Sequence, residues 1–417
     1  MDVKDRYRCP IDWEIITLGD LFAFKNGLNK RKEYFGYGTP IVNYMDVYKR
    51  SGIRAADLNG RVNLSKQEIK AYEVRKGDVF FTRTSETTDE IGIASVMLDD
   101  PQDTVFSGFL LRARPRNECL DDQFKKYCFS TNEVRKAIIS KSSYTTRALT
   151  NGRLLSSVTI PLPSIHEQRA IAAALSDVDA LIAALDRLIA KKRDIKQAAM
   201  QELLTGKKRL PGFSGKLSSV CLGELGSFSK GRGIKKDDVA ASGIPCVRYG
   251  EIYTHYNDYI REFHSFISEE IAKESQQIRN GDLLFAGSGE TAEEIGKCVA
   301  YLKDEEACAG GDIVIFSPEK QNSMYLGYLM NHSSIVIQKA RMGQGDAVVH
   351  ISAKNLAGLR LKLPPINEQN AIASILSDMD AEIAALETRH QKTLALKQGM
   401  MQELLTGRIR LIKGAEA

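Results

Sequence analysis

The sequence predicts an α+β fold in which two similar mixed α/β globular units are separated by two long helices forming an antiparallel coiled coil, an internal pseudo-two-fold repeat. Residues 162–210 match residues 363–411 at a constant offset of 201 without a gap, and 29 of the 49 positions are identical. Both blocks have helical periodicity, and shorter matches precede each of them. At 417 residues, the chain also exceeds what one hydrophobic core usually serves.

The shorter matches predict the strands and turns of the two globular units. They pair residues 18–21 with 222–225, 38–42 with 243–247, 77–81 with 281–285, and 90–92 with 294–296. Each is a short run of apolar, β-branched or aromatic residues bounded by Gly, Pro or Asp, which is typical of strands in a mixed α/β unit. Most residues between these runs differ, as expected if the two units meet different targets while the helices meet one kind of partner twice.

The two matched blocks predict two long helices, the first from about residue 165 to 205, each roughly 60 Å long. Their apolar residues step alternately by four and three positions, which is the spacing of a coiled-coil seam. The seam residues are Ile171, Leu175, Val178, Ile182 and Leu185 in the first helix and Ile372, Leu376, Met379, Ile383 and Leu386 in the second. Prolines precede both starts, and Gly206 and Gly407 follow the two ends. Core helices of a compact bundle are the alternative, but the polar later turns favour a two-helix rod.

We therefore expect a first globular unit (1–160), a first spacer helix (161–206), a linker (207–214), a second globular unit (215–361), a second spacer helix (362–411) and a tail (412–417). Because the two seams match, the second helix is expected to run back along the first.

Composition and charge are those of an ordinary globular protein. The chain has 58 Lys and Arg against 53 Asp and Glu, a net charge of +5 that permits a polyanionic partner without requiring one. Its first residues lack the apolar core of a signal peptide, and no stretch approaches the ~18 apolar residues of a membrane span, so we expect a cytoplasmic protein without a membrane partner. Its 7 cysteines form no C-x-x-C pair and are expected to be reduced thiols.

No sequence motif specifies a catalytic site. The chain has no phosphate-binding loop, no H-E-x-x-H, no G-x-S-x-G and no Asn-Pro-Pro-aromatic motif, and its 6 histidines show no metal-ligand spacing. The sequence therefore favours a non-catalytic binding protein without a metal site. Two alternatives stay open on the residues alone: an adaptor whose repeated domains bind proteins through the coiled coil, and an enzyme that acts without partners.

The helix blocks carry a resemblance to a known family. Both begin with Glu-Gln (167–168 and 368–369) and end with Gln-Glu-Leu-Leu-Thr-Gly (201–206 and 402–407), and Gly-Asp strands begin at residues 77 and 281. With these motifs the chain resembles, over nearly its whole length, the specificity (S) subunits of type I restriction-modification systems. The resemblance implies two target-recognition domains that each read one half of a bipartite, asymmetric DNA site, and helices that fix the unread spacer.

The same resemblance implies partners and cofactors. Two modification (methyltransferase) subunits would dock on this chain, and restriction (translocase-nuclease) subunits would join them to cut unmodified double-stranded DNA. S-adenosylmethionine, ATP and Mg would belong to those partners, so no cofactor is expected in this chain.

Candidate DNA-binding residues come from three pairs of corresponding segments, chosen because Arg, Lys, Asn, Gln and small polar side chains read base edges or bind phosphates. They are the loops after the Gly-Asp strands (82–87 and 286–291), the basic segments 25–32 and 230–236, and the segments before each long helix (144–147 and 344–350). The candidates are Lys25, Lys30, Arg31, Arg83, Thr84, Ser85, Glu86, Thr87, Tyr144, Arg147, Lys230, Arg232, Lys235, Lys236, Ser288, Glu290, Thr291, Gln344 and His350, with Thr145, Thr146 and Asp346 in the same segments. The alternatives are turns that cap a strand and solvated charged loops.

Overall fold

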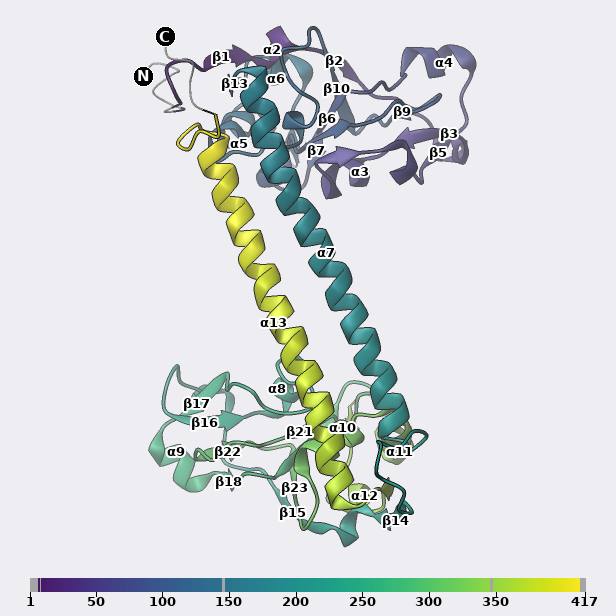
Figure 1. Cartoon of the computed structure of the whole chain (residues 1–417), viewed down its shortest axis with the longest axis vertical. Helices are drawn as coiled ribbons and strands as arrows, with labels where there is room; N and C mark the ends of the chain where they lie inside the picture. The colour runs from purple at the N-terminus through teal and green to yellow at the C-terminus, as the bar shows by residue number, and fades with distance from the viewer. Residues whose placement is uncertain (1–6, 8, 145–146, 346–347, 413–417) are drawn as a thin grey trace. The chain divides into compact units, whose positions relative to one another are not determined.

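The computed structural model describes residues 7, 9–144, 147–345 and 348–412, which form two compact units (Figure 1). Unit 1 consists of Met1–Asp186 with Thr388–Ala417, and unit 2 of Arg187–Glu387. Each unit therefore contains the start of one long helix and the end of the other.

Unit 1 has three small sheets and a pair of strands, in the orders β2-β10-β6-β8-β4, β5-β3-β9, β11-β12-β7 and β1-β13. The strands are β1 (Glu14–Thr17), β2 (Phe22–Asn26), β3 (Phe35–Val42), β4 (Gly52–Ile53), β5 (Arg61–Val62), β6 (Val79–Thr82), β7 (Thr84–Ser85), β8 (Ala94–Met97), β9 (Val105–Phe106), β10 (Leu110–Pro115), β11 (Ser143–Tyr144), β12 (Ala148–Leu149) and β13 (Thr159–Leu162). The short helices are α2 (Leu18–Leu21), α3 (Tyr44–Lys49), α4 (Lys66–Ala71), α5 (Asn132–Ser140) and α6 (Gly152–Ser156), with 3-10 turns η1 (Lys32–Tyr34), η2 (Ala55–Asp57), η3 (Thr88–Glu90) and η4 (Phe124–Lys126).

Unit 2 repeats this plan with the orders β15-β23-β19-β21, β17-β16-β22-β18, β20-β24 and β14-β25. Its strands are β14 (Ser218–Cys221), β15 (Gly226–Lys230), β16 (Ile244–Val247), β17 (Ser265–Ile267), β18 (Gln276–Ile278), β19 (Leu283–Ala286), β20 (Ser288–Gly289), β21 (Cys298–Ala300), β22 (Ala307–Ala309), β23 (Ile313–Pro318), β24 (Val349–His350) and β25 (Arg360–Leu363). The short helices are α8 (Tyr249–Thr254), α9 (Glu269–Glu274), α10 (Ser323–Met330), α11 (Ser333–Met342) and α12 (Ala353–Ala357), with 3-10 turns η5 (Leu222–Glu224) and η6 (Lys236–Asp238).

The Gly-Asp repeat forms the turn that leads into the central strand of each unit. Gly77 and Gly281 have φ of +81° and +97°, a conformation that favours glycine. The following Asp78 accepts a hydrogen bond from the main-chain N of Arg75 at 2.8 Å, and Asp282 makes the same bond in unit 2 at 2.7 Å. Every residue of β6 and β19 is buried, as expected for strands covered on both faces.

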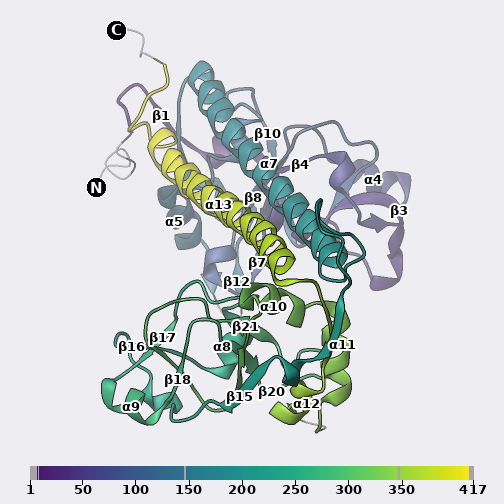
Figure 2. The same cartoon turned by 60° about the horizontal axis from the view of Figure 1, so that its bottom comes forward.

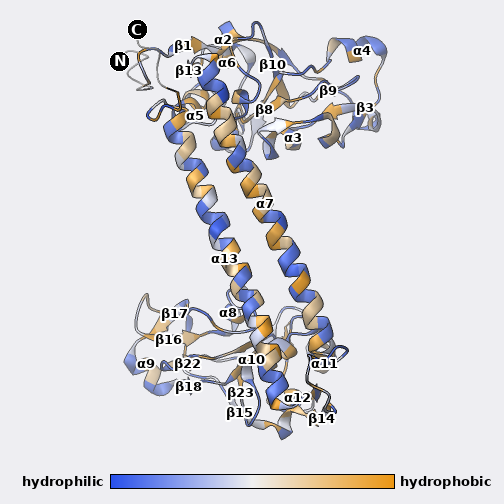
Figure 3. Ribbon diagram, viewed as in Figure 1, coloured by the Kyte–Doolittle hydropathy of each residue, from blue (hydrophilic) through white to orange (hydrophobic). Residues whose placement is uncertain are grey.

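The two long helices are α7 (Ile165–Leu203) and α13 (Ile366–Leu404). Gly206 and Gly407, with φ of +67° and +73°, follow their last turns as predicted. Apolar and polar residues alternate along both helices, as Figure 3 shows. The predicted seam residues are buried or half-buried: Ile171 and Leu376 are fully buried, and Val178 is half-buried.

Within each unit, the segments of the two long helices run antiparallel. In unit 1, Asp179 pairs with Lys397 at 2.6 Å and Asp186 with His390 at 3.0 Å, so a later residue of α7 meets an earlier residue of α13. In unit 2, Lys192 pairs with Glu382 at 2.6 Å and Lys196 with Asp380 at 2.7 Å, in the same direction. The predicted α+β class, with two similar mixed units and two long helices, is confirmed, whereas coiled-coil packing in detail stays a prediction.

Each main core is completed by the end of the other repeat's helix. In unit 1, Ile171 and Leu175 from the start of α7 pack with Leu404 and Leu405 in one apolar cluster. In unit 2, the corresponding start of α13 packs with Met200, Leu203 and Leu204. In both cores, the start of one long helix packs against the end of the other. Each helix therefore has to fit equivalent partners at both of its ends, which accounts for the near-identity of the two helices.

None of the helices in the described ranges is both long enough and apolar enough to cross a membrane.

Candidate nucleic-acid interface

The strongest sequence candidates lie in two equivalent loops. Loop 1 (residues 83–91) connects β6 to β8, and loop 2 (residues 287–295) connects β19 to β21. Both strand pairs are antiparallel, so each loop leaves the central sheet and returns to it. At the base of loop 1, the N of Gly92 donates to the O of Thr82 at 3.0 Å; at the base of loop 2, the N of Gly296 donates to the O of Ala286 at 3.1 Å.

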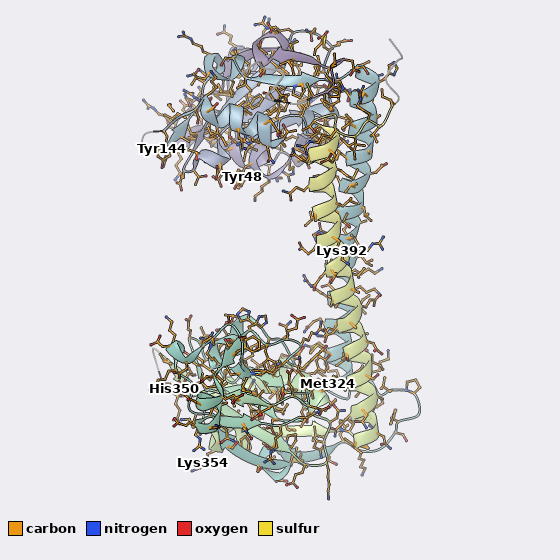
Figure 4. All side chains as sticks on the ribbon, turned by 90° about the vertical axis from the view of Figure 1, so that its left-hand side faces the viewer. Tyr48, Tyr144, Met324, His350, Lys354 and Lys392 are labelled. Carbon is orange, nitrogen blue, oxygen red and sulfur yellow. The ribbon has the colours of Figure 1, made fainter. Side chains whose placement is uncertain are left out.

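The structure brings each loop together with the segment that precedes the long helix. In unit 1, β7 of loop 1 pairs with β12, which pairs with β11, so that Thr84 lies opposite Leu149 and Tyr144 opposite Ala148. The main-chain N of Thr150 also donates to the O of Arg83 at 3.0 Å. Two segments that the sequence proposed separately therefore form one small sheet. Tyr48 and Tyr144 lie along the same lower edge of unit 1 in Figure 4.

Unit 2 makes the equivalent arrangement. Here β20 of loop 2 pairs with β24, so that Ser288 lies opposite His350, and the Oγ of Ser288 is 2.9 Å from the Nδ1 of His350. Gln344 bridges to His350 through main-chain hydrogen bonds. Figure 4 shows His350 and Lys354 on the side of unit 2 away from α13.

A cleft of about 490 Å³ gathers all three predicted segments of unit 2. Lys230 from β15, Ser288 from loop 2, and Gln344 and His350 from the pre-helix segment line it, together with Asp312. Figure 2 shows β15, β20 and α12 close together in this part of unit 2. The side chains that line the cleft include both hydrogen-bond donors and hydrogen-bond acceptors, which suits the reading of base edges.

Exposure divides the candidates into two groups. In unit 1, Arg31, Glu86, Thr87, Tyr144 and Arg147 are exposed, and Arg83 and Thr84 are half-buried; in unit 2, Lys230, Arg232, Lys235, Lys236, Glu290, Thr291, Gln344 and His350 are exposed. Ser85 and Ser288 are only 6% exposed. Their hydroxyls bond to Glu90 and His350, so both serines support neighbouring side chains from within the protein. Thr145, Thr146 and Asp346 lie outside the described residues.

Two basic candidates of unit 1 are held by internal contacts. The Nζ of Lys30 lies 2.6 Å from Glu68, and its hydrogen bond lowers the pKa of that carboxyl to about 2. The Nζ of Lys25 lies 5.1 Å from the centre of the Tyr72 ring and donates to the O of Ala71. Lys25 and Lys230 lie in the corresponding strands β2 and β15. A phosphate at Lys30 would have to compete with Glu68.

A pair of tyrosines beside loop 1 was not singled out by the sequence reasoning. Tyr44 and Tyr48 of α3 stack at 5.9 Å between ring centres. The hydroxyl of Tyr48 donates to Glu90 at 2.7 Å, which lowers the pKa of that carboxyl, and Ser85 donates to the other oxygen of Glu90 at 3.0 Å. Glu90 thus ties the end of loop 1 to its start and to α3. Burial raises the pKa of Tyr44.

Unit 2 has tyrosines at the two equivalent positions of α8. Tyr253 of α8 donates from its hydroxyl to the main-chain O of Ser288 at 3.0 Å, and burial raises the pKa of that hydroxyl. Tyr249 precedes it by four residues and is 42% exposed. The signal was in the sequence: the matched runs 38–42 and 243–247 both continue to Tyr-x-x-x-Tyr, at 44–48 and 249–253.

Within the ranges that the structure describes, no group of three or more His, Cys, Asp or Glu side chains is arranged to hold a metal ion.

Comparison with known proteins decides the family. The model of the type I restriction modification DNA specificity domain matches residues 10–192 and, a second time, residues 216–396. The chain belongs to this family. This type I specificity protein is 24% identical to a putative type I restriction enzyme specificity subunit, MjaX, of Methanocaldococcus jannaschii, over 96% of this chain and 95% of the relative. It is 23% identical to the MjaVIII specificity subunit of the same organism, over 97% and 94%.

The fold comparison agrees. A crystal structure of the type I S subunit from M. genitalium superposes with a TM-score of 0.57 at 16% identity, covering 94% of this chain and 96% of that one. This likeness concerns the fold. The family predicted from the repeated helix ends is confirmed by the two matches of the family model. Its two matched copies make this type I specificity protein a DNA-specificity subunit rather than a catalytic one.

Proposed function

We propose that this specificity subunit reads a bipartite, asymmetric DNA site, one half with unit 1 and the other with unit 2. The observation that carries the proposal is the repeated geometry of loops 1 and 2, each paired with its pre-helix segment, in units whose exposed side chains differ. Unit 1 presents Arg83, Arg147 and Tyr144, whereas unit 2 presents Lys230, Gln344 and His350 around a cleft. Equivalent backbone arrangements that carry different side chains suit two different half-sites.

The side chains suggest how each half is read. Arg83 of unit 1 can donate two hydrogen bonds to one guanine edge, a contact that typically discriminates by about 1–3 kcal/mol. Gln344 of unit 2 can pair with an adenine edge in the same way. The lysines and arginines of 230–236 are exposed, and we expect them to bind phosphates, which gives affinity without sequence preference.

Partner subunits are part of the proposal. The long helices expose apolar side chains away from their seams: Leu181, Leu188 and Ile195 on α7, spaced by seven residues, and Leu394 and Leu396 on α13. We propose that two modification subunits pack against these faces, and that restriction subunits join the complex to cut unmodified DNA. S-adenosylmethionine, ATP and magnesium would act on those partners, in the cytoplasm where the host DNA lies.

Selection from a pool of random-sequence duplex DNA by the full chain with its modification subunits tests the proposal. The wild type should select two short fixed sequences separated by unspecified bases. Arg83→Ala should change the bases selected in one half, and His350→Ala those in the other. Arg169→Ala, an exposed arginine on α7 that pairs with Asp121 at 3.4 Å, serves as the matched control and should select the wild-type sequence.

Two results would count against this function. Selection of no sequence by the wild type, or loss of both halves in the Arg83 variant, would contradict modular reading. Salt dependence separates the adaptor alternative: binding should weaken steeply as ionic strength rises if phosphates are contacted, whereas an apolar protein interface would change little.

A further inference from the structure

A cation from a neighbouring helix holds the base of loop 1. The guanidinium of Arg135, on α5, donates to the main-chain O of Gly92 at 2.8 Å, of Ile91 at 2.7 Å and of Asp89 at 2.8 Å. Gly92 has a φ of +63°, so the chain turns sharply where the loop rejoins β8. One side chain therefore holds three main-chain carbonyl groups of this turn, those of Asp89, Ile91 and Gly92.

Unit 2 places a different cation on the equivalent carbonyl. Lys339 of α11 is 1% exposed, and its Nζ donates to the main-chain O of Gly296. Gly296 has a φ of +68° and closes loop 2 as Gly92 closes loop 1. A buried ammonium is costly, so a purely apolar contact would be the cheaper way to fill this place.

The two cations occupy different positions of the same helix. At the offset of 201 residues, Arg135 matches Val336, and Lys339 matches Ile138. These positions are three residues apart on the helix and share a face. The two units have thus exchanged a cation and an aliphatic residue between neighbouring positions, and the cation still reaches the same glycine carbonyl.

Packing around the glycines agrees with a shared site. A Cβ on Gly92 would meet the Cγ2 of Ile138 at 2.5 Å, and one on Gly296 would meet the Cδ of Lys339 at 3.1 Å. Position 138 or 339 therefore covers the glycine directly in both units. In unit 1, the arginine at position 135 is long enough to bond to the carbonyl of Gly92 from three residues earlier in the helix.

We propose that Arg135 and Lys339 are positioning residues for sequence recognition: each fixes the base of its loop, and so the orientation of the base-reading side chains, without touching DNA. The inference rests on the proposed reading of one half-site by each unit. It predicts that each cation governs one half of the selected sequence only, and that its action depends on reaching the glycine carbonyl rather than on its own place in the helix.

Exchanged variants of the full chain test this directly. Arg135→Val should loosen loop 1, raising amide hydrogen exchange in residues 83–92 while leaving loop 2 unchanged, and should lower discrimination at the unit-1 half-site by roughly tenfold. The double variant Arg135→Val with Ile138→Lys installs the arrangement of unit 2 and should restore both properties. Lys339→Ile, and Lys339→Ile with Val336→Arg, form the reciprocal pair in unit 2.

The outcomes separate positioning from simple stabilisation and from the proposed function. Positioning is supported if the increase in amide hydrogen exchange is confined to the loop of the mutated unit and the double variant restores both the exchange and the selected bases. Unchanged exchange and selection in Arg135→Val, or loosening of the whole unit that the double variant reverses without restoring the selected bases, overturns it. If the wild type selects no sequence, the proposed function fails, while the exchange measurements still decide whether the cations hold the loops.

Discussion

The Nζ of Lys196 lies 2.7 Å from the carboxylate of Asp380 in unit 2, and unit 1 repeats this pair with Lys397 and Asp179 at 2.6 Å. All four residues correspond at the offset of 201. A tyrosine completes each site, since Tyr328 donates to Asp380 at 2.6 Å and Tyr127 to Asp179 at 2.7 Å. The internal repeat therefore preserves a contact network between the two long helices and the domain beside them.

The two sites differ in the carboxylates that face the lysine, which gives a prediction about stability. In unit 2, Lys196 also lies 3.3 Å from Asp258, whose burial raises its pKa. Asp380→Asn leaves Lys196 with that second carboxylate, whereas Asp179→Asn removes the ion-pair partner of Lys397 that the described residues provide. We expect Asp179→Asn to cost roughly 1–2 kcal/mol more than Asp380→Asn. Amide exchange of each unit in the two full-chain variants measures the difference, and equal losses would contradict it.

A second pair of repeated contacts predicts the opposite difference in stability, with the larger loss in unit 2. Glu167 and Glu368 are both 1% exposed, and they accept hydrogen bonds from Arg410 and Arg209 respectively. Glu167 also accepts from the indole of Trp13 at 3.0 Å. Arg209→Ala should therefore destabilise unit 2 more than Arg410→Ala destabilises unit 1, because Trp13 still satisfies part of the carboxylate that Arg410 leaves.

The size of this effect follows from leaving a buried charge unpaired, which costs about 3–5 kcal/mol when no other partner remains. Denaturant unfolding, followed by Trp13 fluorescence for unit 1 and by amide exchange for unit 2, compares the two variants. Glu368→Gln combined with Arg209→Ala is the control, and it should recover much of the loss. A larger loss in Arg410→Ala would show that the indole bond contributes little.

Identity between the repeats determined which parts of the fold were predictable. The long helices were predictable because each must pack at its start and its end against equivalent partners, so residues such as Glu167, Asp179 and Lys196 recur at one offset. The strand framework followed from the Gly, Pro and Asp residues that set its turns. Completion of each core by the other helix was not predicted, because periodicity shows that a face is apolar but not which core covers it.

The candidate site was predicted in part. Both loops and both pre-helix segments were named from the sequence, but their pairing depends on long-range strand contacts that no local pattern encodes. The cations at the loop bases were missed because Arg135 and Lys339 do not align with each other. A cationic side chain can reach the same carbonyl from either of two positions on a helix face. The two units can therefore make the same contact without having identical residues at matching positions.

Lys339 gives a prediction about pH. Burial lowers the pKa of its ammonium to about 8 from an ordinary value of 10.5. Between these values the unfolded chain holds a proton on this residue and the native chain does not, so its contribution to the free energy of unfolding rises as pH increases from about 8 to 10.5 and is least favourable below that window.

The comparison with Lys339→Met isolates this contribution. The free energy of unfolding of the wild type should gain on the order of 3 kcal/mol relative to the variant across the window, because the variant has no group to titrate there. Denaturant unfolding of unit 2 at a series of pH values measures the gain. Lys392→Met, which removes an exposed lysine of α13 labelled in Figure 4, controls for the loss of one amine. A difference that stays constant with pH would rule out a lowered pKa.

The length of the long helices gives the last prediction, which concerns the unread bases between the half-sites. Four residues inserted after Asp186 in α7 and four after Glu387 in α13 fall between the ion pairs of unit 1 and those of unit 2, so the pairs Asp179–Lys397 and Lys196–Asp380 are kept. Each helix gains about one turn, roughly 6 Å. The selected half-sites should be unchanged, while the spacer lengthens by about two base pairs at most, given a rise of about 3.4 Å per base pair.

Insertion in α7 alone is the matched control, because it shifts one helix against the other and should destabilise the chain instead of resetting the spacer. Selection from random duplex DNA reads both variants, and an unchanged spacer in the double insertion would mean that something other than these helices sets the distance between the two halves.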